Sequence, residues 1–181
     1  MIAHLLDTAR LEGGVFHLAP RPVDLAALAR ETADLLRAPG ATLLVQAPTV
    51  LWRTCDPERV RQALENLLGN AIKHSPKGAP IVVSVEARER RDGEWAVLTV
   101  RDEGPGVAPD LLPTLFERFA RGRDSTGLGL GLYLTRGIAE AHGGTLTAAA
   151  EPNIMSTLGH RLSFVQGASV VATAPQAHAR Q

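Results

Sequence analysis

Residues 56–76 read DPERVRQALENLLGNAIKHSP, and this stretch says more about the fold than any other part of the chain. Asp56 can cap a helix, and Pro57 falls in its first turn, where the missing N–H of proline costs nothing. Ser75 and Pro76 end the pattern, because the residue before a proline avoids helical backbone angles. The apolar positions recur at helical spacing and form one face: Val60, Leu64, Leu67, Leu68 and Ala71. We therefore predict a long amphipathic helix over residues 56–74.

A polar face runs beside this apolar face. Asn66, Asn70 and Lys73 stand at i, i+4 and i+7, so they share one side of the helix, and His74 follows directly. A neutral amide oxygen suits one position of an octahedral Mg²⁺ whose other ligands are water and phosphate oxygens. Lys73, one of two lysines in the chain, could reach a phosphate. The alternative is a solvated face on which Lys73 complements the negative end of the helix dipole.

The rest of the chain alternates between helical and strand-like patterns. Residues 1–12 have helical spacing that ends at two glycines, and Asp24 can cap a second helix that ends before Pro39. Strand-like runs occupy residues 15–18, 42–46, 50–55, 81–87 and 95–100. A short helix is expected at 111–116, followed by a last helix ending at residues 143–144 and further strand material. Because these elements mix without regular strand–helix–strand spacing, we predict an α+β fold, a two-layer sandwich of a mixed, mostly antiparallel sheet with helices on one face.

Residues 102–106 read DEGPG and come directly after an apolar strand. A carboxylate at a strand end can accept a hydrogen bond from an amino group such as the adenine 6-amine, and glycines let a ligand approach the backbone. A hydrogen bond to a charged acceptor is worth about 1.5–3 kcal/mol, enough to discriminate against a base with a carbonyl there. An ordinary acidic turn is the alternative.

Residues 127–132 read GLGLGL and open the last helix. A glycine within a helix costs about 1 kcal/mol relative to alanine, so a compensating role is expected. Backbone N–H groups at a helix N-terminus, with no side chains in the way, form an anion site suited to phosphates. The segment lacks the Gly-Lys-Ser/Thr of a P-loop and does not follow a strand in a Rossmann-type unit.

Four motifs occur in a fixed order: the asparagine-bearing helix, DEGPG, LFERF at residues 115–119, and GLGLGL. Together they resemble the histidine-kinase branch of the ATPase superfamily that also contains gyrase B, Hsp90 and MutL. The resemblance covers about residues 20–175 of the chain. It implies a Bergerat-type ATP-binding fold with ATP and Mg²⁺ as cofactors.

The resemblance implies a role for each nucleotide-binding motif. Asn70 would ligate Mg²⁺, Lys73 and His74 would contact the phosphates, and Asp102 would hold the adenine amine. The remaining residues that it places around the nucleotide are Gly104, Gly106, Val107, Thr126, Gly127, Leu128, Gly129, Leu130 and Gly131.

Residues 117–126 resemble a mobile lid. By this resemblance Arg121, together with Arg118, would stabilise charge on the transferring γ-phosphate. Phe116 and Phe119 would anchor the lid to the core.

Asn66 separates the branches of this superfamily. The hydrolysing relatives carry a glutamate at the corresponding place to activate water, and asparagine cannot act as that base. The resemblance therefore implies a protein-histidine kinase, which transfers phosphate to a better nucleophile and hydrolyses ATP slowly. The expected catalytic residues are Asn66, Asn70, Lys73 and Arg121.

The nucleophile in this family is a histidine on a two-helix dimerisation element that precedes the ATPase domain. The chain has six histidines, and none is followed by an acidic residue and then, a turn later, by proline. The phosphoacceptor is therefore expected outside this chain, on the parent kinase or its dimer mate, and the phosphate would pass on to an aspartate of a response regulator. Two alternatives remain: an anti-sigma-factor-type serine kinase, against which residues 1–14 count, and a nucleotide-binding module without transferase activity.

The resemblance also suggests domain boundaries. Residues 1–14 resemble the end of the dimerisation helix, residues 15–175 the kinase domain, and residues 176–181 a tail. Within the domain, residues 151–166 look inserted. Residues 167–175 then resemble the closing strand, although residues 159–165 compete for that role.

Composition limits the partners and the location. Hydrophobic residues make up 45% of the 181, enough for a core, and the net charge of +0 argues against a nucleic-acid partner. No apolar run is long enough to span a bilayer and no signal peptide is evident, so any membrane attachment would need an upstream segment. The lone Cys55 lies in a strand-like run and is expected in the core. We expect a cytoplasmic domain, which could be the cytoplasmic part of a membrane-bound sensor.

Overall fold

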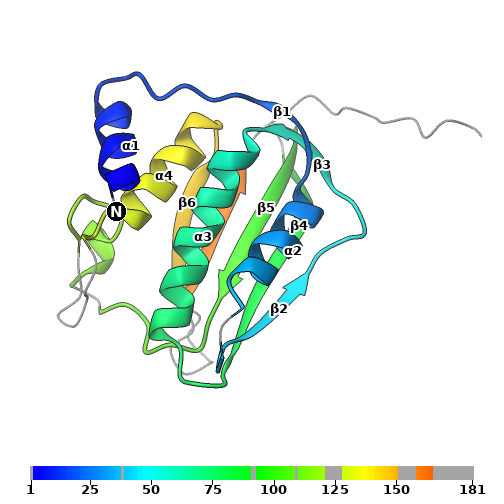
Figure 1. Cartoon of the computed structure of the whole chain (residues 1–181), viewed down its shortest axis with the longest axis vertical. Coiled ribbons are helices and arrows are strands. Elements are labelled where there is room, and N and C mark those ends of the chain that lie inside the picture. The colour runs from blue at the N-terminus through cyan, green and yellow to red at the C-terminus, as the bar shows by residue number, and fades with distance from the viewer. Residues whose placement is uncertain are drawn as a thin grey trace, which may run out of the picture.

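A five-stranded sheet forms one layer of the molecule, and three helices cover one of its faces (Figure 1). The computed structural model describes residues 2–37, 39–90, 93–108, 110–120, 128–150 and 158–164. In sheet order the strands are β2 (Thr42–Gln46), β4 (Pro80–Arg90), β5 (Gly93–Arg101), β7 (Leu158–Phe164) and β6 (Thr145–Ala150). Strands β2 and β4 are parallel and the other neighbours antiparallel. The helices are α2 (Leu25–Leu35), α3 (Pro57–His74) and α4 (Gly131–Ala141). The predicted α+β class and layering are confirmed.

Helix α3 lies at the centre of the core. The side chain of Asp56 accepts hydrogen bonds from the backbone N–H groups of Glu58 and Arg59, both at 3.1 Å, which begins the helix as predicted. The apolar face of α3 packs on β4 and β5 and is fully buried at Val60, Leu64, Leu67 and Leu68. Burying such a side chain stabilises the fold by about 1.5–3 kcal/mol. The polar face of α3 is therefore held in a fixed direction relative to the sheet.

Helix α1 (Ile2–Glu12) packs against α4 and is also joined to α3. The carboxylate of Asp7 is 6% exposed and lies 2.8 Å from Nη1 of Arg59. It also accepts a hydrogen bond of 2.9 Å from Gln62. Asp7 keeps its charge because the hydrogen bonds to these two α3 residues lower its pKa and outweigh the effect of burial. The end of α1 thus has a defined position beside the two central helices.

The segment between α1 and α2 differs from the sequence prediction. Residues 15–18 form no strand; instead β1 (Arg21–Asp24) pairs antiparallel with β3 (Trp52–Cys55) in a separate two-stranded sheet. Residues 15–19 are held by side chains, because Arg59 stacks on the Phe16 ring at 4.6 Å and Asp56 accepts from the N–H of Ala19 at 2.8 Å. Asp24 caps α2 as predicted, accepting from the N–H of Ala26 at 3.0 Å.

Two shorter differences concern residues 50–55 and 111–116. Strand β3 begins two residues later than predicted, at Trp52, and the buried Cys55 ends it as an expected core residue. The predicted helix at 111–116 is a single 3-10 turn, Leu112–Thr114. Its bond runs back to the third residue, from the N–H of Leu115 to the carbonyl of Leu112 at 3.4 Å, as in the short 3-10 segments that serve as connectors.

Strand β7 settles which residues continue the sheet after β6. It lies between β5 and β6 and pairs antiparallel with both, with Leu162 opposite Leu98 of β5 and opposite Leu146 of β6. Residues 158–164 of the segment expected as an insertion are therefore an inner strand, because β5 and β6 each need a partner for their backbone groups. Residues 167–175, the other candidate for the closing strand, lie outside the described residues.

Candidate functional site

The polar face of α3 meets the first turn of α4. Asn66 and Asn70 are half-buried there, whereas Lys73 and His74 are exposed at the end of α3. The Nδ2 of Asn66 donates to the carbonyl oxygen of Gly131 at 3.3 Å. A side chain at Gly131 would begin 3.6 Å from the Oδ1 of Asn66. The structure therefore joins the asparagine motif to the glycine motif directly.

No side chain of the described residues caps the N-terminus of α4. The helix begins at Gly131, and the preceding Leu130 is buried and provides no side-chain cap. The first N–H groups of a helix have no partner within the helix and carry the positive end of its dipole. Glycine at the first position leaves the approach to these groups clear. The end of α4 can therefore bind an anion such as a phosphate.

Gly129 brings together the two ends of the segment 121–127. Its φ is +67°, and a Cβ there would lie 2.6 Å from the carbonyl oxygen of Ala120 and 2.7 Å from the carbonyl carbon of Phe119. The N–H of Phe119 donates to the carbonyl oxygen of Gly129 at 3.0 Å. Only glycine fits this close crossing of two backbones.

Arg118, beside this crossing, is paired with Glu12 at the end of α1. Its guanidinium also lies over the ring of Phe119, 5.0 Å from the centroid. Phe116 packs against the core, whereas Phe119 is 52% exposed. The contact with Glu12 directs Arg118 towards α1.

Asp102 is the buried carboxylate of the site. It follows β5 directly, is 4% exposed, and accepts a hydrogen bond of 2.7 Å from the N–H of Gly104. Burial raises the pKa of this carboxyl group, and the Gly104 N–H and the nearby His74 oppose that rise. Among the described residues nothing donates to the second oxygen, Oδ2. Asp102 can therefore accept a hydrogen bond from a ligand.

Gly104 places Asp102 beside the end of α3. A Cβ on Gly104 would lie 2.7 Å from Oδ1 of Asp102 and 3.0 Å from the carbonyl oxygen of His74. The ends of β5 and α3 meet at the lower end of the molecule in Figure 1. The phosphate-binding and base-binding motifs predicted from sequence thus occupy one end of the sandwich.

A protein-family model described as "Histidine kinase-, DNA gyrase B-, and HSP90-like ATPase" matches residues 55–178, which include all four motifs. The chain belongs to this ATPase family. The family predicted from the motifs is confirmed.

Named relatives fall in the histidine-kinase branch of the family. The sensor protein KdpD of Escherichia coli is 36% identical over 161 residues, which cover 84% of this chain and 17% of KdpD. The crystal structure of full-length ShkA in complex with AMPPNP superposes with a TM-score of 0.72 at 27% identity, covering 91% of this chain and 35% of that one. The mycobacterial sensor histidine kinase MprB gives a TM-score of 0.68 at 27% identity, covering 81% of this chain and 98% of that one. The chain therefore corresponds to a small part of the longer relatives and to nearly the whole MprB structure.

Within this ATPase domain, some predicted residues lie outside the described part of the chain: Arg121, Thr126 and Gly127. Leu130 is buried, so only its backbone can face a ligand, and Leu128 is 39% exposed. Gly106 has a φ of +75° and Val107 is half-buried, just beyond Asp102. The other predicted residues gather between α3, α4 and the end of β5.

Two residues of the site were not predicted. Thr135 is fully buried and contacts Asn66, and Glu12 pairs with Arg118. Thr135 stands one helical turn after Gly131, so the spacing i, i+4 within the glycine-led helix is a signal that could have found it. No local pattern links Glu12 to Arg118, which are 106 positions apart.

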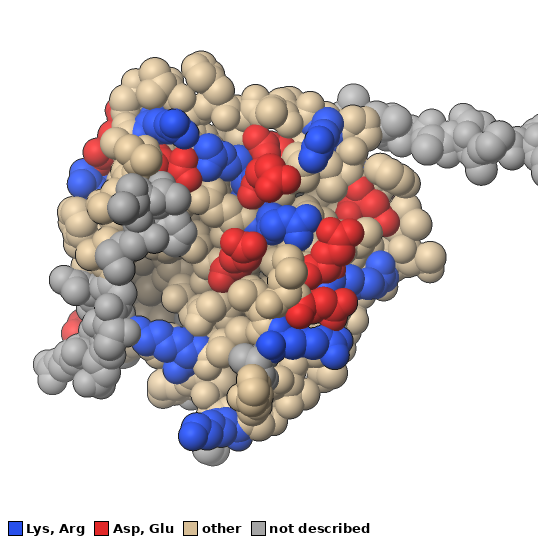
Figure 2. Space-filling model, viewed as in Figure 1, with Lys and Arg blue, Asp and Glu red and all other residues tan. Residues whose placement is uncertain are grey.

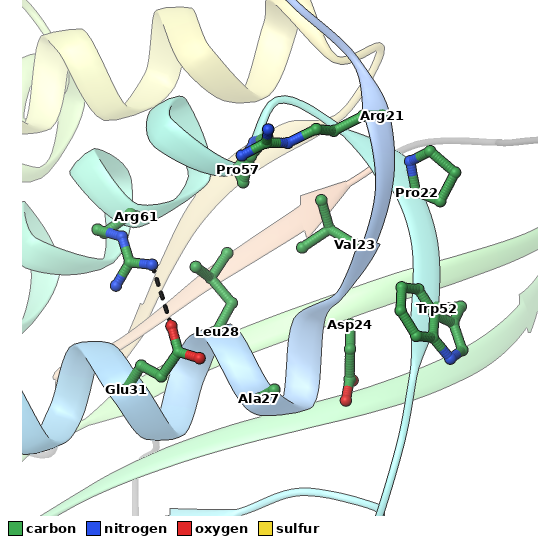
Figure 3. A pocket seen from close by; sticks show the side chains of 10 residues that line it. All are labelled: Arg21, Pro22, Val23, Asp24, Ala27, Leu28, Glu31, Trp52, Pro57 and Arg61. Atoms are coloured by element: carbon green, nitrogen blue, oxygen red, sulfur yellow. Dashed lines mark hydrogen bonds and ion pairs between the residues drawn. The ribbon is translucent and has the colours of Figure 1, made fainter.

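A separate open pocket of about 270 Å³ lies between the β1–β3 sheet and helices α2 and α3 (Figure 3). Val23, Leu28 and Trp52 line it, and Arg61 is paired there with Glu31 at 3.1 Å. It contains none of the predicted nucleotide-binding residues. Figure 2 shows acidic and basic side chains interspersed on the visible face, in keeping with the net charge of +0.

The described part of the chain contains no group of three or more His, Cys, Asp or Glu side chains that could hold a metal ion. In the same part, no helix has both the length and the apolar character needed to cross a bilayer.

Proposed function

We propose that this chain is the ATP-binding catalytic domain of a sensor histidine kinase. It transfers the γ-phosphate of ATP to a histidine outside this chain, from which the phosphate passes to an aspartate of a response regulator. The observation that carries the proposal is the contact of Asn66 with Gly131, which sets the amide-bearing face of α3 against the open end of α4. The sensor-kinase names of the relatives support the same reaction.

The base of the nucleotide is recognised by Asp102. Its buried carboxylate offers Oδ2 to the adenine 6-amine, while Gly104 holds Oδ1. A guanine carbonyl at that place would face a carboxylate with no proton to share, so ATP is preferred to GTP. Gly106 and Val107 form the adjoining wall.

A magnesium ion fits the donors present. Mg²⁺ prefers oxygen ligands and usually keeps several waters, with one or two protein ligands and the phosphates of a nucleotide. Asn70 would supply one amide oxygen, and phosphate oxygens and water would fill the remaining positions. Bound in this way, the ion would neutralise phosphate charge and orient the γ-phosphate.

The residues around the phosphates favour transfer over hydrolysis. Lys73 and His74 lie at the end of α3 and contact the phosphates, and the backbone amides from Gly127 to Gly131 hold them at the end of α4. Asn66 cannot deprotonate water, so the domain alone turns over ATP slowly. Arg121 and, once released from Glu12, Arg118 stabilise the charge on the transferring group.

The ends of the chain connect this domain to its partners. Residues 1–14 are the end of the dimerisation helix, which brings the phosphoacceptor helix of the parent kinase or its dimer mate to the site. Residues 15–175 are the kinase domain, in which the segment 151–166 includes strand β7, and residues 176–181 are a tail. The domain works in the cytoplasm.

Titration calorimetry of the chain with ATP and Mg²⁺ tests nucleotide binding, and labelled ATP with an added phosphoacceptor hairpin tests transfer. We expect binding, transfer to the hairpin histidine and little phosphate release without the hairpin. Binding without transfer to the hairpin or to an anti-sigma-type partner would favour the nucleotide-binding module. Transfer to a serine of such a partner would favour the serine kinase instead.

A further inference from the structure

Thr135 connects the two helices of the proposed nucleotide site. It lies on α4, is fully buried, and its Oγ1 donates to the carbonyl oxygen of Gly131 at 2.8 Å. The Nδ2 of Asn66, on α3, donates to that same carbonyl at 3.3 Å and to Oγ1 of Thr135 at 3.4 Å. The hydroxyl and the carbonyl therefore form a pair of atoms that faces one side-chain amide.

The chemistry of this pair permits only one orientation of Asn66. A carbonyl oxygen can only accept a hydrogen bond, and the hydroxyl of Thr135 has already given its proton to Gly131. Both atoms therefore offer lone pairs to Asn66. The amide must turn its NH₂ group towards α4, because the opposite orientation would place its oxygen against two acceptors.

The orientation of the Asn66 amide determines which of its atoms a ligand can contact. The two acceptors lie too close together to take both N–H groups of the amide, so one N–H is shared between them. The Oδ1 of Asn66 is turned away from both acceptors, and within the described part of the chain no group donates to it. Asn66 can therefore offer the site an acceptor in Oδ1. A phosphate oxygen offers no proton to such an atom, whereas a water bound to a cation offers two.

We infer that Thr135 is a positioning residue that holds Asn66 as an acceptor for water in the coordination shell of the nucleotide-bound cation. The inference rests on the proposed function and adds the partner of Asn66 to it. It also predicts that a carboxylate does not suit position 66. An aspartate there would turn an oxygen towards Gly131, and Thr135 could compensate only by giving up its 2.8 Å bond to that carbonyl.

The test compares Thr135→Val, which removes the hydroxyl at nearly constant shape, with Thr135→Ser, which keeps it. Calorimetry of the 181-residue chain measures ATP affinity with Mg²⁺ and with EDTA. We expect Thr135→Val to weaken the Mg²⁺-dependent affinity by about three- to tenfold, the size of one hydrogen bond, and to leave the EDTA value within about twofold. Thr135→Ser should match the parent chain in both conditions. An equal loss with and without Mg²⁺, or no loss, would overturn the inference.

A second measurement needs no nucleotide. In the ligand-free chain, the side-chain NH₂ signals of Asn66 in an NMR spectrum should exchange slowly with water in the parent chain and in Thr135→Ser, and faster in Thr135→Val. Equal exchange in all three would show that Thr135 does not hold the amide. A parent chain that binds no ATP but shows the protected amide would refute the proposed function and the water contact, and leave the positioning role standing.

Asn66→Asp is the second variant, for use if Thr135→Val does not fold. We expect it to lose the protected contact with α4 and to gain no ATP hydrolysis, because the carboxylate is not held in the direction of Oδ1. A rise in hydrolysis together with unchanged stability would contradict this.

Discussion

The backbone N–H of Phe119 donates to the carbonyl oxygen of Gly129 at 3.0 Å, so the chain just before the segment 121–127 is fastened to the chain just after it. Both residues have left-handed backbones, with φ of 62° at Phe119 and +67° at Gly129. This conformation is uncommon for a non-glycine residue such as Phe119, and the hydrogen bond from Phe119 to Gly129 compensates for its cost. The base of the proposed lid is therefore fixed by the domain itself, and binding of a nucleotide need not assemble it.

Gly129→Ala should destabilise the domain and weaken ATP binding together. The new Cβ would lie 2.6 Å from the carbonyl oxygen of Ala120, in addition to the strain of a left-handed alanine, which alone costs about 1–2 kcal/mol. Gly143→Ala is the matched control, because Gly143 has a φ of +75° with open space around it. Urea unfolding and calorimetry should show a larger loss for Gly129→Ala and unchanged ATP affinity for Gly143→Ala. Equal effects of the two would mean that the crossing at Gly129 does not matter.

Asp102→Asn should remove the preference for ATP over GTP without lowering the stability of the ligand-free chain. Burial raises the pKa of the Asp102 carboxyl above its value in the unfolded chain, so the fold loses stability as the pH rises from the unfolded pKa through the folded one, and a neutral side chain avoids this cost. The amide can still accept from Gly104, but then turns its NH₂ towards the adenine amine. We expect the ATP-to-GTP affinity ratio to fall by about tenfold or more. Retained selectivity in competition binding would exclude Asp102 as the adenine contact.

Asn70→Ala should abolish the Mg²⁺-dependent part of ATP affinity and leave the fold intact. Asn70 is half-buried and makes no hydrogen bond within the described part of the chain, so its removal should change the unfolding free energy by less than about 0.5 kcal/mol. Calorimetry with Mg²⁺ and with EDTA should then give the same affinity. A variant that still binds more tightly with Mg²⁺ would place the ion elsewhere.

Glu12→Gln should weaken the contact that holds Arg118, because an amide oxygen accepts a weaker hydrogen bond than a carboxylate. ATP binding should strengthen by about twofold or more, because the guanidinium beside the site can then turn more readily towards the triphosphate. The pair is 41% exposed on both sides, so its loss should cost less than about 1 kcal/mol of stability. Glu140→Gln breaks the comparably exposed Arg136–Glu140 pair on α4 and serves as the control. Weaker ATP binding in Glu12→Gln would show that the contact with α1 supports the site and does not restrain it.

Acidification should destabilise the domain through His142. Its Nε2 accepts from the N–H of Asp56 at 3.0 Å while Nδ1 bonds the carbonyl of Ile138 at 2.8 Å, so the ring is neutral in the fold. Burial lowers its pKa below 6.5, the hydrogen bond to Ile138 and the charge of Asp56 opposing this only in part. As the pH falls, His142 of the unfolded chain therefore takes up a proton at a higher pH than His142 of the folded chain. The stability is fully present above the pKa of the unfolded chain and is lost as the pH falls towards the pKa of the folded chain.

Urea unfolding at about pH 7.5 and about pH 5 measures how far acidification lowers the free energy of unfolding. His142→Gln, which can keep an acceptor for Asp56 but cannot titrate, should lose less stability on acidification than the parent chain. His17→Gln changes an exposed histidine and should leave the difference between the two pH values as in the parent. An identical pH dependence in all three chains would rule out His142 as its source.

Helix α3 was predictable from its sequence, and so was the direction of its two faces. The Asp56 cap, the apolar spacing and the Ser75-Pro76 stop act within a few residues, and the structure contains all three. The chain around residues 15–24 was not predictable in the same way. The contacts that replace the expected strand come from Asp56 and Arg59, which are distant in sequence. The choice of β7 likewise depended on the two neighbours that it pairs with in the sheet.

The sequence by itself therefore determined which residue types gather at the site: two amides on one helical face, a carboxylate at a strand end and glycines at a helix start. Only the tertiary structure decided how they are oriented. The amide of Asn66 is turned by acceptors 65 and 69 positions further along the chain, and Arg118 is drawn aside by a glutamate on the first helix. Helical periodicity and capping depend on residues that are close in sequence, so they can be predicted from the sequence. The direction of a side-chain hydrogen bond depends on which distant part of the backbone lies next to that side chain in the folded core.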